Sequence, residues 1–167
     1  MYSSLENISV LECYAEYLPV EEIKFDVVFA RQAMHHAYHL DKFISAAYSN
    51  LKKDGILMTV RDHVVSDENE KLSFFKRHPL HKFYGGENAF SEYEYKNAMI
   101  KAGFKILKTL KHSDSVINFY PWNKDRLSGR LKILNKIPFI TDIAWKYLQW
   151  CWNKMPGRLY TFIAKKT

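Results

Sequence analysis

Two short apolar runs separated by one amphipathic helical pattern constrain the fold of this chain most strongly. The first run, residues 25–30, is nearly all apolar, which is typical of a strand covered on both faces of a parallel sheet. Apolar residues then recur at helical spacing from Leu40 to Leu51, and an Asp-Gly turn leads into the second run, residues 56–60. A strand, a helix and a strand in this order predict a βαβ unit with a right-handed crossover.

Polar residues follow both predicted strands. Residues 31–36 come directly after the first strand, and the Arg-Asp-His segment at residues 61–63 comes after the second. In open α/β sheets, ligands bind outside the carboxyl ends of the strands. We therefore expect functional side chains in these two segments.

The rest of the chain supplies further predicted elements. Ser91 is a predicted N-cap for a helix that Gly103 ends, and a later helical pattern lies in a basic, Trp-rich region at residues 121–153. These elements are a strand at Ile8–Glu12, a helix at Glu92–Ala102, a strand at Phe104–Leu110, a helix at Ile140–Trp152 and a final strand at Leu159–Ala164.

Composition limits the class of protein. The 167 residues are 47% apolar and 26% charged, which suits one globular domain with its own core. The net charge of +7 permits acidic ligands, but Lys and Arg are scattered, which argues against a nucleic-acid partner. Cys13 and Cys151 have no metal-ligand spacing, and no leader-like or membrane-spanning run is apparent, so we expect a soluble protein of a reducing cytoplasm.

The segments taken in order resemble the class I S-adenosylmethionine-dependent methyltransferases, in particular the small-molecule group that includes ubiquinone and sterol methyltransferases. The resemblance covers about residues 8 to 110, and residues 157–162 resemble the family's last strand. The matching segments are Ala15–Pro19, Phe25–Val28, Met34–His36, Leu51–Leu57, Phe90–Ser91 with Glu94, and Ala102–Phe104. The resemblance implies an α/β fold, a Rossmann-like three-layer sandwich, in a single partial domain of residues 1–167 whose final strand lies within residues 157–167.

The chain departs from this family at the cofactor site. The family's glycine-rich turn and the acidic residue that follows its second strand have no counterpart, since the only neighbouring glycines, Gly85 and Gly86, precede no strand-to-helix turn. We therefore expect an N-terminally truncated fold without strands one and two of the family order 3-2-1-4-5-7-6. Strand four would then expose an apolar edge, which predicts self-association or a partner chain that covers it.

The resemblance assigns cofactor contacts for S-adenosylmethionine. Tyr14 and Ala15 correspond to the loop that contacts adenine, although many relatives have aspartate in place of Tyr14, and a half-buried aromatic at a strand end is the alternative. Arg31 and Gln32 would lie beside the methionine part of the cofactor, where Arg31 could pair with the carboxylate. The alternative for Arg31 is an arginine that points to solvent.

Histidines supply candidate bases. His36 could act as general base for a hydroxyl nucleophile, and His63 is its rival, because the ordinary histidine pKa suits physiological pH. A helix-packing histidine is the alternative reading of His36. A metal site at His35 and His39 is disfavoured because no acidic third ligand lies at motif spacing.

The acceptor is expected at residues 78–87, a loop dense in titratable side chains. His78, His81, Tyr84 and Glu87 are its candidate substrate-binding residues, and an ordinary surface loop is the alternative. Such side chains suit hydroxyl groups, which predicts methyl transfer to a hydroxyl of a sugar, lipid or natural product.

Two further functions stay open. The chain could be a non-catalytic remnant or subunit, an interaction module completed by another chain. The Trp-rich, basic region could also contact a membrane surface or cover an apolar acceptor, although a helix packed on the sheet is the simpler reading.

Overall fold

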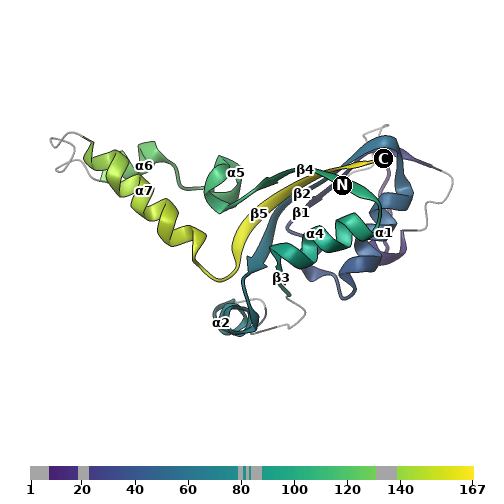
Figure 1. Ribbon diagram of the computed structural model, residues 1–167, viewed down its shortest axis with the longest axis horizontal. Coiled ribbons are helices and arrows are strands. Elements are labelled where there is room, and N and C mark those ends of the chain that lie inside the picture. Colours follow the sequence, from purple (N-terminus) through teal and green to yellow (C-terminus); the bar gives the residue numbers. More distant parts are fainter. Residues whose placement is uncertain (1–7, 19–22, 79–80, 82, 84–87, 131–138) are drawn as a thin grey trace.

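The computed structural model describes residues 8–18, 23–78, 81, 83, 88–130 and 139–167. Strands and helices alternate in the first two thirds of the chain, and helices dominate the part before the last strand (Figure 1). In chain order the elements are η1 (Ala15–Tyr17), β1 (Phe25–Arg31), η2 (Met34–His36), α1 (Leu40–Asn50), β2 (Leu51–Val65), α2 (Glu68–Arg77), β3 (Phe90–Ser91), α4 (Glu92–Lys101), β4 (Phe104–Leu110), η3 (His112–Asp114), α5 (Val116–Phe119), α6 (Lys124–Arg130), α7 (Ile140–Asn153) and β5 (Arg158–Lys166).

The main sheet has the strand order β1-β2-β5-β4, and β3 pairs with the end of β2. β1 and β2 run parallel, with Val27 opposite Ile56 and Arg31 opposite Val60, while β5 is antiparallel to both β2 and β4. This order matches strands 4-5-7-6 of the methyltransferase sheet. The α/β, Rossmann-like fold class and the predicted βαβ unit are confirmed.

One face of the sheet carries the core. Helices α1 and α4 lie on this face (Figure 1), and the apolar side of α1 is buried there as the helical spacing predicts. Tyr95 from α4 packs against Phe162 of β5 at a ring-centroid distance of 5.3 Å. Ser91 and Glu94 form the predicted capping box at the start of α4.

The other face of β1 is not covered by the described residues. Val28 and Ala30 pack into the core, but Val27 and Phe29, which alternate with them, are 53% and 58% exposed. The expectation that this strand is covered on both faces is therefore wrong for the part of the chain that the structure describes. The side chains of this run are apolar on both faces of the strand, as in a strand buried on both faces, but the described residues pack against one face only.

Residues 8–12 do not form the expected strand. They are exposed and belong to no ladder, and the following η1 packs against α1 instead. A β-branched run needs a neighbouring strand to pair with, and the described sheet offers none beside this segment.

Helices α5, α6 and α7 extend away from the sheet as an arm (Figure 1). The helix predicted at residues 140–152 is confirmed, but it packs on η3 and α6, so the expectation that it packs on the sheet is wrong. Aromatic contacts hold the base of the arm, where Trp145 and Trp152 of α7 both contact Phe119 of α5. Among the described helices, none is both long enough and apolar enough to cross a membrane.

Candidate functional site

A β-bulge shapes the end of β2. Between Thr59 and Asp62 the chain advances three residues, while the paired β5 advances two, from Phe162 to Tyr160. Arg61 lies in this bulge with a left-handed φ of 63°. Because an extra residue reverses the alternation of side chains, Asp62 is fully buried at a position that regular pleating would turn to the other face.

A second left-handed residue ends the neighbouring strand. Gln32 follows β1 with a φ of 49°, and its main-chain N–H donates to the carbonyl oxygen of Val60 at 2.8 Å. Non-glycine residues in this conformation are costly and concentrate at functional sites. The carboxyl ends of β1 and β2 are thus both locally irregular, side by side in the sheet.

Asp62 binds His35 of η2. The Asp62 oxygen Oδ1 lies 3.1 Å from His35 Nδ1 and accepts the His35 main-chain N–H at 3.2 Å. Both side chains are buried, and the His35 residue is 2% exposed. Because His35 Nδ1 faces this carboxylate oxygen, Nδ1 is the donor of the pair, which leaves Nε2 of the ring as the acceptor.

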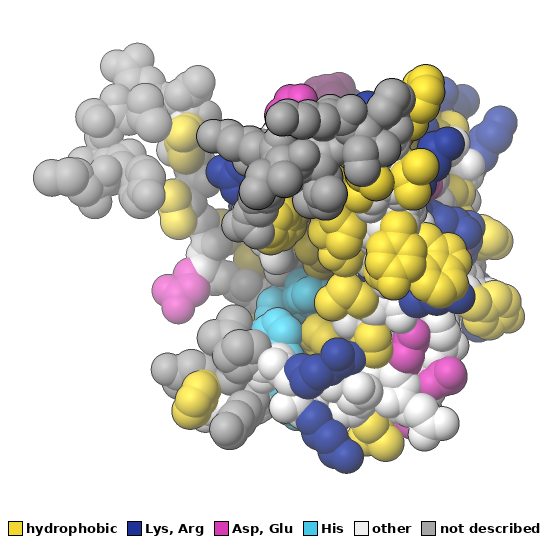
Figure 2. Space-filling view, turned by 90° about the vertical axis from the view of Figure 1, so that its left-hand side faces the viewer, with side chains coloured by type: hydrophobic (Ala, Val, Ile, Leu, Met, Phe, Trp, Pro, Cys, Tyr) yellow, Lys and Arg dark blue, Asp and Glu magenta, His cyan; other side chains and the backbone are white. Residues whose placement is uncertain are grey.

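Four imidazole rings form a continuous series that starts at the exposed His36. Their ring centroids are 4.2 Å apart between His36 and His35, 4.6 Å between His35 and His63, and 5.4 Å between His63 and His78. We call these four residues the histidine column. Figure 2 shows histidine side chains gathered in a hollow on this face of the molecule.

His63 is neutral at physiological pH. Burial lowers the pKa of His63 to about 4, with smaller contributions in the same direction from neighbouring histidines, although the bond to the Gly157 carbonyl opposes this shift. His63 Nδ1 lies 2.6 Å from that carbonyl oxygen, so Nδ1 is the donor and carries the proton of the neutral ring. The ring can therefore offer Nε2 as an acceptor.

The fold brings together several of the residues singled out by sequence. His36, His63 and His78 share the histidine column, whereas His81 stacks on Phe75 with ring centroids 4.3 Å apart. Tyr84 and Glu87 lie outside the described residues.

Sequence reasoning missed two members of this site, His35 as a positioned ring and the buried Asp62. The signal for Asp62 was its place in the polar segment 61–63; the expectation that this segment follows the strand is wrong, because β2 continues past its bulge to Val65. No cluster of three potential metal ligands exists within the described ranges.

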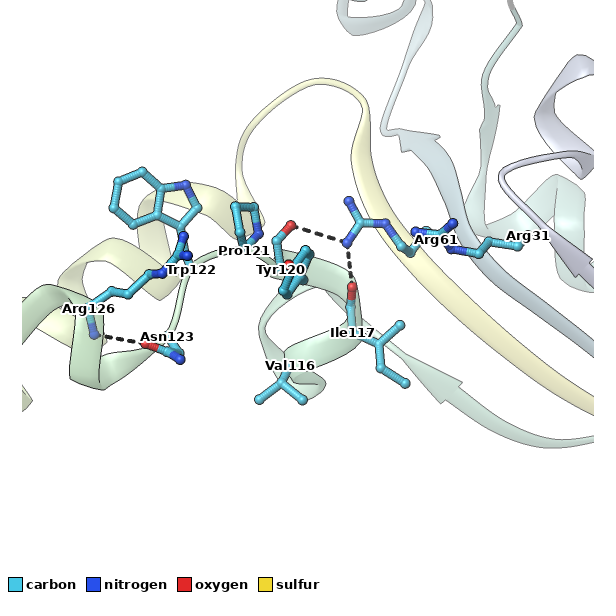
Figure 3. Close-up of a pocket in the computed structure, with 9 residues that line it drawn as sticks. All are labelled: Arg31, Arg61, Val116, Ile117, Tyr120, Pro121, Trp122, Asn123 and Arg126. Carbon is cyan, nitrogen blue, oxygen red and sulfur yellow. Dashed lines mark hydrogen bonds between the residues drawn. The ribbon is translucent and has the colours of Figure 1, made fainter.

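Two cavities share Arg61 in their lining, and one of them reaches the histidine column at His63. One lies between the end of β5 and the arm, and it is lined by His63, Arg61, His112 and Trp152 among others. The other, of about 510 Å³, lies at the carboxyl ends of β1 and β2 (Figure 3). We call this second cavity the arginine pocket, and its lining consists of Arg31, Arg61, Val116, Ile117, Tyr120, Pro121, Trp122, Asn123 and Arg126.

The residues present fit one end of the cofactor that the resemblance implies. The exposed Arg31 side chain can present paired donors to a carboxylate, and Gln32 follows it at the strand end. At the adenine end, Tyr14 is 80% exposed and Ala15 packs against the core. Tyr14 and Ala15 are not among the residues that line the two cavities described above.

Comparison with solved structures relates this geometry to known proteins. A SAM-dependent methyltransferase from Thermotoga maritima has a TM-score of 0.55 at 20% identity, covering 96% of this chain and 65% of that chain. A chain of the complex between the Haloferax volcanii Trm112 methyltransferase activator and a methyltransferase has a TM-score of 0.61 at 12% identity, covering 98% and 64%. Phosphoethanolamine N-methyltransferase 2 from Haemonchus contortus, in complex with phosphomonomethylethanolamine and S-adenosylhomocysteine, has a TM-score of 0.53 at 19% identity, covering 93% and 36%.

The chain spans no more than 65% of the length of these three structures, which share its fold. A comparison with curated proteins gives no match. Residues 2–119, more than half of the chain, match the family described as a methyltransferase domain. The chain belongs to the methyltransferase domain family.

Proposed function

We propose that this chain serves S-adenosylmethionine-dependent methyl transfer to a small-molecule acceptor, and that the acceptor is a hydroxyl of a sugar, lipid or natural product. The observation that carries the proposal is the histidine column with its buried Asp62 at the carboxyl ends of β1 and β2, the edge at which α/β sheets bind ligands. Membership of the methyltransferase domain family supports the reaction class.

Four residues would contact the cofactor. Arg31 would pair with its carboxylate and Gln32 would border the methionine part, while Tyr14 and Ala15 would meet adenine. When bound, S-adenosylmethionine supplies an electrophilic methyl group. A charged guanidinium beside a sulfonium is favourable only when the carboxylate lies between them, which sets the orientation that Arg31 would impose.

His36 and His63 would handle the acceptor's proton. A hydroxyl nucleophile sheds a proton during methyl transfer, and an imidazole at hydrogen-bond distance can accept it. His36 is the exposed end of the column and His63 is the neutral ring within it. His35 would act as a positioning residue, because Asp62 fixes its proton and its ring contacts both of them.

The acceptor would also be bound near α2. His78 joins the histidine column there, and His81 stacks on Phe75 close by. Tyr84 and Glu87 complete the proposed acceptor contacts. Hydrogen-bonding groups of this kind suit hydroxyls better than alkyl chains.

Two experiments test this function, first a measurement of cofactor binding and then a measurement of turnover. Because the glycine-rich turn has no counterpart, we expect weak cofactor binding by this chain alone, and micromolar binding of S-adenosylhomocysteine in a calorimetric titration, weakened by Arg31→Gln, would support a competent enzyme. With labelled S-adenosylmethionine and a panel of hydroxylated acceptors, His36→Gln should lower turnover more than His39→Gln does. His39 is a matched control because its exposed ring contacts Tyr38 and lies outside the histidine column. Absence of binding at millimolar concentration would reject a catalytic role for this chain by itself.

A specific observation favours a second function, that of a non-catalytic subunit or remnant completed by another chain. β1 lies at the edge of the described sheet, and its side chains Val27 and Phe29 are uncovered. A partner or a second copy would bury them. No detectable binding of S-adenosylhomocysteine, together with a stable oligomer in sedimentation, would support this function over the first.

We expect this activity in a reducing cytoplasm. Cys13 and Cys151 are both free thiols, and Cys13 is exposed, which suits a compartment that keeps thiols reduced.

A further inference from the structure

The arginine pocket combines positive charge with an apolar wall. Arg31 comes from the end of β1 and Arg61 from the bulge of β2, and Arg126 comes from α6 on the other side of the pocket (Figure 3). Between them lie exposed apolar and aromatic side chains of the α5 segment and the residues after it. These wall residues are Val116, Ile117, Tyr120, Pro121 and Trp122.

Among the residues that the structure describes, no carboxylate balances the positive charge of this pocket. No Asp or Glu pairs with Arg31, Arg61 or Arg126 within the described residues, and no carboxylate is among those that line the pocket. By contrast, Arg158 nearby is paired with Glu70 at 2.9 Å. Positive charges that share a cavity attract anions and raise their local concentration.

Arg61 holds one wall of the pocket in place. Its Nη1 group donates to the main-chain carbonyl oxygens of Ile117 and Tyr120 (Figure 3), while its buried Nε has no hydrogen-bond partner in the described part of the chain. Burial and the charge of Arg31 both lower the pKa of Arg61. Because neutral carbonyls compensate a partly buried guanidinium only in part, an anion in the pocket would stabilise this arrangement.

We propose that the arginine pocket binds an anionic, amphiphilic molecule, one with a carboxylate or phosphate on an aromatic or extended apolar body. The anionic group is attracted by the guanidinium groups of Arg61 and Arg126, which the proposed cofactor contacts leave free, and the apolar body lies on Tyr120 and Trp122. The cavity of about 510 Å³ lies within the usual range for small-molecule sites. That this molecule is the methyl acceptor rests on the proposed function, whereas its binding does not.

Binding of naphthyl phosphate, followed by calorimetry, tests the pocket directly. We expect saturable binding that Arg126→Gln weakens about tenfold, because a charge-assisted contact to phosphate is lost. Arg126 is exposed, so its replacement leaves the core intact. Arg77→Gln on α2 is the matched control, since Arg77 is also an exposed helical arginine but lies outside the pocket, and it should leave the affinity unchanged.

Two other probes separate the contributions of charge and apolar surface. Naphthol should bind at least tenfold more weakly than naphthyl phosphate because it lacks the charge, and inorganic phosphate should bind at least tenfold more weakly because it lacks the apolar body. Equal affinity for either probe, no binding of naphthyl phosphate at millimolar concentration, or an unchanged affinity in Arg126→Gln would overturn the proposal. Titration with S-adenosylhomocysteine is scored separately, so that failure of cofactor binding rejects the proposed function while naphthyl phosphate still decides the pocket.

Discussion

At the scale of single residues, Asp62 is the group on which the geometry of the histidine column depends. Its Oδ1 atom serves both the main chain and the ring of His35, and within the described residues its buried Oδ2 atom has no hydrogen-bond partner. A buried carboxylate that orients a histidine fixes which nitrogen carries the proton. The His35 ring held in this way lies in contact with the rings of both His36 and His63.

Replacing this carboxylate with an amide should separate positioning from packing. Asp62→Asn keeps the size and one acceptor oxygen, but it removes the charge that holds the proton on His35 Nδ1. We expect turnover to fall roughly tenfold to a hundredfold, the range seen for partners that orient a functional histidine. The His35 imidazole nitrogen shifts, measured by NMR, should show a mixture of tautomers. A variant that folds and keeps both the wild-type turnover and a single tautomer would contradict this role.

Stability should depend on pH through His63. Its pKa falls from 6.5 in the unfolded chain to about 4 in the fold, so the unfolded state binds more protons between these values. Stability therefore rises with pH across this window, is fully present above pH 6.5 and is progressively lost as the pH falls towards 4. The loss amounts to roughly 3 kcal/mol of unfolding free energy. Urea unfolding at a series of pH values measures it.

The control for this prediction is His63→Gln, which cannot titrate. It should flatten the pH dependence without abolishing it, because burial also lowers the pKa of His112 and adds a smaller effect of the same sign. An unchanged slope in His63→Gln would show that another group is responsible.

At the scale of elements, a glycine determines how the arm rejoins the sheet. Gly157, just before β5, has a left-handed φ of 72°, and a Cβ atom there would lie 2.2 Å from the buried ring of Phe74. Gly157→Ala should therefore lower the unfolding free energy by about 3 kcal/mol, from backbone strain and overpacking together. Chemical denaturation measures the loss.

A double mutant separates these two causes. Phe74→Leu is expected to be destabilising by itself, but it makes room for the new methyl group. In the Gly157→Ala, Phe74→Leu protein the combined cost should be smaller than the sum of the two single costs. Strict additivity would mean that the Phe74 ring is not the obstacle.

Much of the element order could be predicted from the sequence, because local signals determine it. The helical spacing of α1, the capping box of α4 and the apolar runs of β1 and β2 each depend on neighbouring residues. Residues 8–12 have the local signal of a strand and form none in the described structure, because pairing depends on a distant partner. The direction taken by α7 is likewise set by contacts with η3 and α6, which its own amphipathic pattern does not encode.

The candidate site was predictable in place but not in detail. The rule for α/β sheets located it at residues 31–36 and 61–63, and both segments contribute to it. The β-bulge before Asp62 could not be foreseen, since it changes which alternate residues are buried. Because the bulge is not visible in the sequence, the sequence patterns indicate His36 and His63 and do not indicate Asp62, the aspartate that binds His35.

At the scale of the whole molecule, the uncovered face of β1 is a source of exposed apolar surface among the described residues. Phe25, Val27 and Phe29 share this face at the edge of the described sheet. Apolar strands at an open edge promote association with other chains. We expect the purified chain to self-associate, and Phe29→Lys to reduce the association constant at least tenfold in sedimentation velocity, because lysine is costly to bury.

The matched control for this prediction is Tyr93→Lys. Tyr93 is 75% exposed on α4, an element on the covered side of the sheet. Its replacement adds the same charge and should leave association unchanged. Equal effects of both variants would point to net charge, and a monomeric wild-type chain would contradict the prediction.

The junction between arm and sheet also has a mechanical consequence. Asn118 on α5 donates to the Leu110 and Lys111 carbonyls and accepts from the Thr161 hydroxyl, and Arg61 clasps the same helix from β2. The sheet and the arm supply opposite walls of the arginine pocket. We therefore expect the width of the pocket to change with the tilt of the arm at this junction. Weakening these hydrogen bonds would broaden the range of ligand sizes that the pocket binds, and strengthening them would narrow that range.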